Sequence, residues 1–193
     1  MAAQYRQQLC ALESLVRGTA QPILVLASAF RVIERTIVSE PVIPTLFEWA
    51  GGMPALDRLT TRFYERVRTD ELLREIFAHM DAHHPHFVAQ FLAEVLGGPA
   101  DYSAERGGHP HMIRQHLGRH LTDVQRKAWM QILLDTADEI GLPGDPEFRS
   151  ALVSYLEWGS RLAVINSQPG AAAEENLPMP LWGWGVPGGP YLG

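Results

Sequence analysis

The chain has 193 residues, of which 46% are apolar and 20% are charged, and its net charge is −6. This length and apolar share favour one medium-sized domain with a core and exclude a chain that is disordered throughout. The mild acidity excludes the basic surface typical of nucleic-acid binding, and the single cysteine, Cys10, excludes a disulfide framework.

Residues 1–44 are predicted to form an N-terminal extension. Apolar residues recur at helical spacing over residues 5–16, and a second helical piece is predicted over 23–35. The apolar run 22–30 is too short to span a membrane, and it lacks the basic start of a secretory signal. We therefore expect a cytoplasmic protein that binds no membrane.

Residues 45–166 carry dense helical patterning. The first helix is predicted by apolar residues at i, i+3, i+7 and i+11, with Tyr64 beside this stripe. The stripe consists of Leu56, Leu59, Phe63 and Val67. Thr69 is predicted to cap a short second helix that begins at Asp70. This first part of the domain is therefore expected to be helical without interruption by strands.

Three further features predict helices later in this zone. A helix over 85–96 ends at a Gly-Gly-Pro sequence. Thr122 and Gln125 form a predicted capping box, and Asp145 is expected to cap a last helix that has Pro146 at its first position. No alternation of apolar and polar residues indicates a strand, so the predicted fold class is all-α.

Residues 167–193 are rich in Pro, Gly and Trp. Proline removes backbone donors and glycine weakens helical order, so we predict an irregular C-terminal tail. The predicted organisation is therefore an N-terminal extension (1–44), a helical domain (45–166) and a tail (167–193).

All eight histidines of the chain lie between residues 79 and 120. Imidazole is the commonest metal-ligating side chain, so this cluster indicates a metal or cofactor site. Its two halves flank the helix predicted over 85–96 and can face one pocket, and the spacing of His116 and His120 suits one helical face. The residues alone leave three interpretations open: axial ligation of haem, a non-haem metal site, or solvated surface histidines.

Five collinear segments within residues 45–166 resemble the truncated haemoglobins, and specifically group II of that family. They read TLFEWAGG, RFYERV, FLAEVLGGPADYS, RGGHPHMIRQH and QRKAWM. The resemblance implies a shortened globin, a two-over-two helical sandwich around haem b. The N-terminal helical extension and the irregular C-terminal tail lie outside it.

The resemblance assigns roles to individual residues. His116 matches the proximal ligand of the haem iron. Tyr64 matches the distal tyrosine, and Trp129 matches the tryptophan that distinguishes groups II and III from group I. Both side chains can donate a hydrogen bond to a bound diatomic ligand. Phe77 matches an aromatic residue that wedges against the haem, where many members carry Tyr, so we expect a simpler distal network here.

His84 falls at the distal gate position of the family, with Val88 and Phe91 one and two turns further along the helix. A histidine at this position would narrow the entry path, add a hydrogen-bond donor or bind the iron in the ligand-free state. His83, one residue earlier, is the alternative.

The expected contacts to the haem propionates come from Tyr102 and Arg114, whereas Gln115 stands where the family often has Arg. The remaining histidines are not expected to bind the iron or its ligand. His79, His86 and His120 are expected to be solvated, and His109 and His111 are expected to shape the loop before the proximal histidine.

The resemblance implies a protein that binds O2, NO and CO and serves in oxygen binding or transport. It also implies redox chemistry, either NO dioxygenation or a peroxidase-like reaction. Both reactions need a reductase partner, since the sequence shows no flavin or nicotinamide domain. A homodimer is compatible with the sequence, and whether the protein is an enzyme stays open.

Two alternatives remain at this point. One is a non-haem metal-binding protein that uses the histidine cluster. The other is a haem-based gas sensor whose tail aromatics, Trp182, Trp184 and Tyr191, dock onto a partner.

Overall fold

The computed structural model describes residues 42–185 and 189–190, and this part of the chain is helical without strands. The all-α prediction is thus confirmed, whereas the helices predicted over 5–16 and 23–35 lie outside the described residues. The helices are α3 (Leu46–Ala50), α4 (Gly52–Val67), α5 (His84–Val95), α6 (Asp101–Arg106), α7 (Gly108–His116), α8 (Asp123–Glu139) and α9 (Pro146–Asn166).

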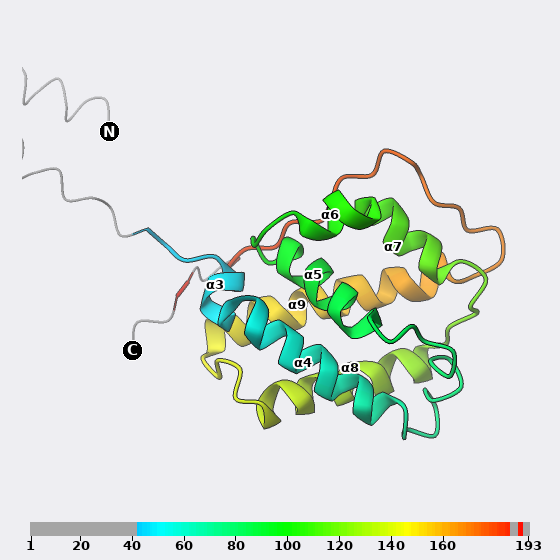
Figure 1. The fold of residues 1–193 in the computed structure, drawn as a ribbon, viewed down its shortest axis with the longest axis horizontal. Coiled ribbons are helices and arrows are strands. Elements are labelled where there is room, and N and C mark those ends of the chain that lie inside the picture. The colour runs from blue at the N-terminus through cyan, green and yellow to red at the C-terminus, as the bar shows by residue number, and fades with distance from the viewer. Residues whose placement is uncertain (1–41, 186–188, 191–193) are drawn as a thin grey trace, which may run out of the picture. The chain divides into compact units, whose positions relative to one another are not determined.

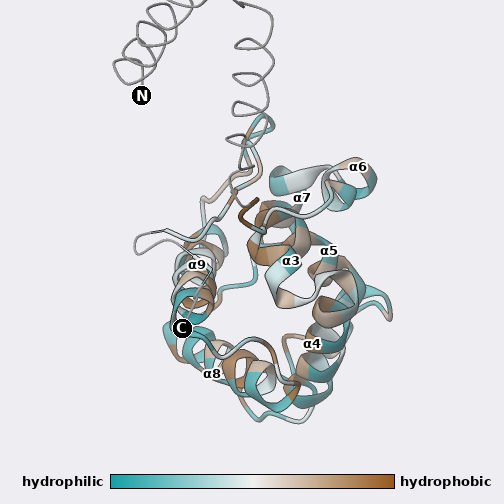
Figure 2. Ribbon diagram, turned by 90° about the vertical axis from the view of Figure 1, so that its left-hand side faces the viewer, coloured by the Kyte–Doolittle hydropathy of each residue, from teal (hydrophilic) through white to brown (hydrophobic). Residues whose placement is uncertain are grey.

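The four longest helices form the frame of the domain. Helix α4 packs against α5 and α8, and α9 packs against α8 and α7. Figure 1 shows α4 and α5 as one pair and α8 and α9 as the other, which is the predicted two-over-two arrangement. Viewed from the side, α9, α8, α4 and α5 follow one another around the domain, with α3 and α7 closing its remaining side (Figure 2).

The apolar stripe predicted for the first long helix is the core-facing side of α4. Its four members are buried, and Phe63 and Val67 are fully inaccessible to solvent. Tyr64, beside the stripe, is also buried. Burial of this side accounts for the formation of α4, because most of the stability of a helix in a protein comes from packing of its apolar face.

The caps predicted for the last two long helices are present. Thr122 and Gln125 form the capping box of α8, with side chain and backbone bonded reciprocally. The Asp145 carboxylate accepts the N–H of Phe148 at 2.9 Å and so caps α9, with Pro146 in its first turn. These local signals satisfy N–H groups that have no partner within the helix.

The short helix predicted to begin at Asp70 is wrong. Residues 71–79 form successive turns without becoming an α-helix. At the start of these turns the Asp70 carboxylate accepts the N–H groups of Leu72 and Leu73. The Thr69 hydroxyl instead donates back to the carbonyl of Arg66 at the end of α4, at 2.8 Å. The predicted capping contact of Thr69 is therefore made by Asp70.

The predicted helical face shared by His116 and His120 is also wrong. Helix α7 ends at His116, and the chain then passes through Gly118 with φ of 71° and His120 with φ of 51°. Left-handed residues of this kind end a helix. The N–H of His120 bonds to the carbonyl of Ser167 instead, which ties this loop to the end of α9.

The junction after α5 requires a residue without a side chain. A Cβ atom on Gly98 would lie 2.7 Å from Cγ of Phe47 and 2.8 Å from the carbonyl oxygen of Ala93. The backbone of this turn therefore lies directly against α3. Close packing of this kind holds the start of the domain against the end of α5.

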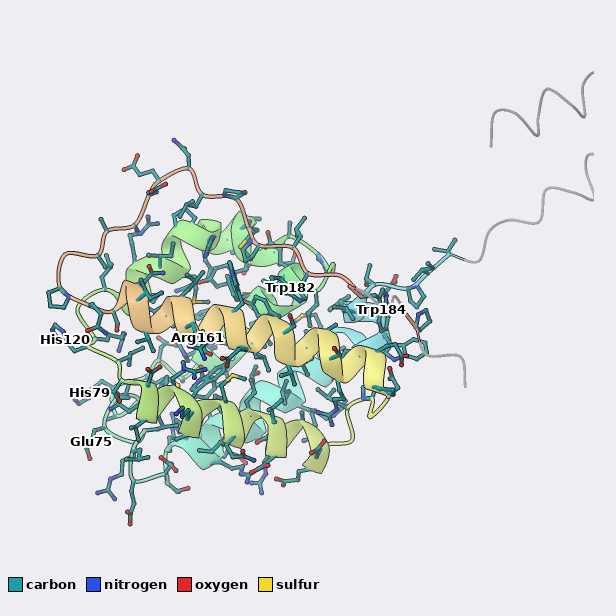
Figure 3. The ribbon with its side chains drawn as sticks, turned by 180° about the vertical axis from the view of Figure 1, so that it is seen from behind. Glu75, His79, His120, Arg161, Trp182 and Trp184 are labelled. Atoms are coloured by element: carbon teal, nitrogen blue, oxygen red, sulfur yellow. The ribbon has the colours of Figure 1, made fainter. Side chains whose placement is uncertain are left out.

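The tail leaves α9 at Ser167 and continues without helix through residue 185, as predicted. It returns past α6 and α7 toward the start of the domain (Figure 1), and Trp182 and Trp184 lie near its end (Figure 3). Within the described residues, no helix has the length and apolar character needed to cross a membrane.

Candidate functional site

A cavity of about 670 Å³ lies among the helices, with walls formed by α4, α5, α7, α8, α9 and the turns before α5. This volume is in the range of about 300–1,000 Å³ that is typical of ligand and cofactor sites. Most lining side chains are apolar or aromatic, and a few polar groups converge on the same space. The two histidine-bearing regions on either side of α5 both contribute to this wall, as predicted.

His116, at the C-terminal end of α7, lies in the cavity wall. Its Nδ1 donates a hydrogen bond to the carbonyl of Met112, one turn earlier, at 2.8 Å. Burial lowers the pKa of the His116 imidazole below its ordinary value, more than the Met112 carbonyl raises it. A neutral imidazole with its proton on Nδ1 has an unprotonated Nε2, which is the form that binds a metal ion.

Tyr64 lines the cavity from α4 and is buried. Its hydroxyl oxygen lies 3.0 Å from Nε2 of His84, the first residue of α5. The rings of Tyr64 and Phe77 meet edge to face with their centroids 5.4 Å apart. Burial raises the pKa of Tyr64 above its ordinary value, so the phenol keeps its proton and remains a hydrogen-bond donor.

His84 is half-buried against Tyr64 and Phe77. Burial is the main cause that lowers the pKa of His84 to about 4, with Arg119, His116 and Arg106 adding to the effect and Asp81 opposing it. The imidazole is therefore neutral at pH 7.

His83, the alternative gate residue, is exposed, and its ring lies beside Phe87 with the centroids 6.2 Å apart. Both histidines line the cavity, but His84 is the one that contacts Tyr64. The geometry therefore distinguishes the two residues that the sequence left as alternatives.

Trp129 lines the cavity from α8. Its ring meets Phe63 edge to face, with the centroids 5.2 Å apart, so the core fixes its position. Its indole Nε1 makes no hydrogen bond within the part of the chain that the structure describes. Since an indole N–H can only donate, Trp129 is available as a donor to a ligand in the cavity.

The expected haem-contacting residues Phe77, Val88, Phe91 and Tyr102 all line the cavity. Phe91 and Tyr102 are buried and meet edge to face, with their centroids 5.1 Å apart. Burial raises the pKa of Tyr102 to about 12, against the opposing effect of Arg106 and Arg114. The Tyr102 hydroxyl is therefore protonated at neutral pH and can donate.

Arg114, in contrast, is exposed and is not among the lining residues, whereas Arg106 and Arg119 are. The Arg106 guanidinium lies over the ring of Phe87, 3.8 Å from its centroid. Its buried Nε finds no hydrogen-bond partner among the described residues. A cation with an unused buried donor at the cavity fits an anionic group, such as the propionate carboxylates of haem.

A local excess of positive charge in the sequence could have pointed to Arg106 and Arg119. The stretch 106–121 contains three arginines and no Asp or Glu. Six other cations of the described chain, in contrast, form ion pairs with carboxylates. A basic stretch without internal counter-ions is consistent with an anion that comes from outside the chain.

The remaining histidines do not converge on a metal site. His86 bonds to Asp57 at the surface, and Gln115 reaches His111 at 3.4 Å. His79, His86 and His120 are exposed, as expected. Within residues 42–185 and 189–190, no group of three or more His, Cys, Asp or Glu side chains is placed to hold a metal ion. The cavity geometry thus favours one histidine acting alone over a multi-ligand cluster.

The tail aromatics expected to dock onto a partner in the gas-sensor alternative pack on their own domain. Trp182 lies against Tyr155 and Trp158, and Trp184 lies against Trp49. Tyr191 lies outside the described residues.

Comparison with known proteins agrees with this geometry. Residues 45–157 match the family model described as bacterial-like globin. A group 2 truncated haemoglobin of Bacillus subtilis is 36% identical over 119 residues, which cover 62% of this chain and 88% of that protein.

Two solved structures have a similar fold. The truncated oxygen-avid haemoglobin from Bacillus subtilis is 34% identical with a TM-score of 0.56, over 63% of this chain and 99% of that one. The group II truncated haemoglobin from Bacillus anthracis is 27% identical with a TM-score of 0.59, over 72% of this chain and 98% of that one.

Proposed function

Because the chain belongs to the bacterial-like globin family, we propose that it holds haem b through His116 and uses Tyr64, Trp129 and His84 to stabilise the bound gas. Haem b is the cofactor of the truncated haemoglobins, and the chain is a globin of that type. Haem supplies an iron centre that binds O2, NO and CO. The residues of this chain determine how firmly each ligand is held.

One hydrogen bond supports the proposed role of His116 as the iron ligand. Because Nδ1 donates to the Met112 carbonyl, the ring is held in one orientation and its free nitrogen is Nε2. His116 lies on α7, whereas the proposed distal residues come from α4, α5 and α8 around the same cavity. This arrangement leaves the space between them for the cofactor and a small ligand.

The proposed distal side has three polar side chains. Tyr64 has one hydroxyl proton, Trp129 has one indole proton, and His84 is neutral and contacts the Tyr64 hydroxyl. Donors held in place before the ligand arrives stabilise the partial negative charge that O2 develops on binding. We therefore propose high O2 affinity, the property named for the oxygen-avid haemoglobin of Bacillus subtilis, and from the three polar side chains we also propose slow release of O2.

The proposed partners of the haem propionates are Arg106, Arg119 and Tyr102. The buried Nε of Arg106 lacks a partner among the described residues and is the donor best suited to a carboxylate. Arg114 stands outside the cavity wall, whereas Arg106 and Arg119 line it.

The proposed physiological role is O2 binding and transport, or turnover of O2 and NO in the cytoplasm. NO dioxygenation or a peroxidase-like reaction requires electrons, which a separate reductase would supply. The globin domain of this proposal spans residues 45–166, between an N-terminal extension (1–44) and the tail (167–193).

An absorbance spectrum of the purified protein tests the haem site. We expect a Soret band in the wild type, and its loss or strong displacement in His116→Ala. His120→Ala is the matched control, because His120 is exposed and lies outside the cavity wall. A wild type that takes up no haem, or a His116→Ala variant with an unchanged spectrum, would contradict the proposal.

A further inference from the structure

The tail residues 178–184, called the clasp here, are fastened to the globin domain at three places. His109 Nδ1 donates to the carbonyl of Pro178 at 3.2 Å. The backbone N–H of Trp182 donates to the carbonyl of Val95 at 2.8 Å. The indole of Trp184 donates to the carbonyl of Pro44 at 2.7 Å. The clasp thus bridges α7, the end of α5 and the residues before α3.

Aromatic contacts reinforce these hydrogen bonds. The Trp182 ring packs against Tyr155 and Trp158 of α9, with centroid separations of 5.7 and 5.6 Å. The Trp184 ring meets Trp49 edge to face at 5.7 Å. Tryptophan buries a large apolar area in such contacts, so these two side chains are the anchors of the clasp. Figure 3 shows both of them at the α9 side of the domain.

The clasp also forms part of the cavity wall. Pro180 lines the cavity, and so do three of the side chains that hold or flank the clasp: His109, Tyr155 and Trp158. Residues 178–184 lie beyond the stretch 45–157 that matches the family model. A segment that follows the matched stretch therefore contributes to the wall of the site.

We propose that the clasp retains the cofactor, an inference that rests on the haem site proposed above. Haem held by a single imidazole and a few polar contacts leaves when one side of the cavity opens. On the side formed by α7 and α9, opening requires the Trp182 anchor to detach and the bond from His109 to Pro178 to break. The clasp therefore slows haem loss, while the distal residues on α4 and α8 keep their contacts.

Transfer of haem from the ferric protein to an excess of apomyoglobin measures this retention directly. Trp182→Ala is expected to speed the transfer by about tenfold, as loss of one half-buried aromatic anchor predicts. Trp182→Phe keeps a ring in the same place and should restore most of the retention. Leu181→Ala is the matched control, because the neighbouring Leu181 side chain is 74% exposed and should leave the rate unchanged.

Two further measurements separate the clasp from a general loss of stability. Hydrogen exchange should show that the backbone amide at position 182, which donates to Val95 in the wild type, exchanges faster in Trp182→Ala. The O2 release rate of this variant should equal that of the wild type. Should Trp182→Ala fail to fold, Pro180→Gly loosens the clasp without removing an anchor and should speed haem transfer as well.

The outcomes are distinguishable. A wild type without a Soret band overturns the haem site and the clasp together. A normal Soret band with wild-type haem transfer, in a Trp182→Ala variant whose backbone amide at position 182 exchanges faster, overturns the clasp alone. Faster transfer in the Leu181→Ala control also contradicts it, because the effect would not depend on the anchor.

Discussion

The hydroxyl oxygen of Tyr64 lies 3.0 Å from Nε2 of His84. This contact joins α4 to the first residue of α5 and places two polar side chains at one part of the cavity wall. A tyrosine has only one hydroxyl proton to donate. The neutral His84 beside Tyr64 and a ligand bound in the cavity would therefore both interact with the same Tyr64 hydroxyl. We therefore expect the two residues to act on a bound ligand as a coupled pair.

Coupling of the pair is measurable as a double-mutant cycle on O2 release. Tyr64→Phe is expected to speed O2 release, at a cost of about 1–3 kcal/mol for one lost buried donor. His84→Leu should change the effect of Tyr64→Phe by about 0.5–3 kcal/mol, as found for residues in direct contact. Stopped-flow release rates of the four proteins give this coupling energy, and strictly additive effects would contradict it.

The pH dependence of the pair follows from the lowered pKa of His84. Since burial holds this pKa at about 4, His84 is neutral above that value and becomes an imidazolium only as the pH falls through it. The raised pKa of Tyr64 keeps the phenol protonated on the alkaline side. We expect the C–O stretching frequency of the CO complex to stay constant between about pH 5.5 and 8.5. A transition near the ordinary histidine value of about 6.5 would contradict this prediction.

Trp129 is predicted to hold the ligand through its indole N–H. Trp129→Phe keeps an aromatic ring against Phe63 but removes the donor, so O2 release should accelerate by about tenfold or more. The control is Trp49→Phe, because the Trp49 indole is already bonded to Asp145 at 2.9 Å and lies outside the cavity wall. An unchanged O2 release rate in Trp129→Phe would remove this residue from the ligand site.

The placement of the arginines predicts a difference between two otherwise similar variants. Arg106→Ala removes a cation of the cavity wall and should weaken haem retention by about tenfold, as loss of a charge-assisted hydrogen bond predicts. Arg114→Ala makes the same change in charge at an exposed position and should have little effect. Haem transfer to apomyoglobin compares the two, and an equal effect of both variants would show that only net charge matters.

Helix boundaries were predictable where the determinants lie within a few residues of one another. The capping box of Thr122 and Gln125 and the Asp145 cap with its following proline are complete within one turn, and both are present in the structure. The apolar stripe of α4 is also a local pattern, and its side chains are buried in the core as the pattern predicts. The same reasoning failed for residues 71–79, which form turns instead of a helix. Just before them the Thr69 hydroxyl donates back to Arg66, and Asp70 accepts the N–H groups of the following turn.

The helical class and the main caps follow from the amino-acid sequence, and its resemblance to a known family identifies most of the candidate residues that line the cavity. Packing of the helices, in contrast, brings His84 and not His83 into contact with Tyr64. It also places Arg106 and Arg119, and not Arg114, in the cavity wall. The same packing lets Trp182 and Trp184 lie against their own domain. The physical reason is distance along the chain: helix caps and apolar stripes are short-range, whereas Tyr64 and His84, or Trp184 and Pro44, meet only after the helices have packed.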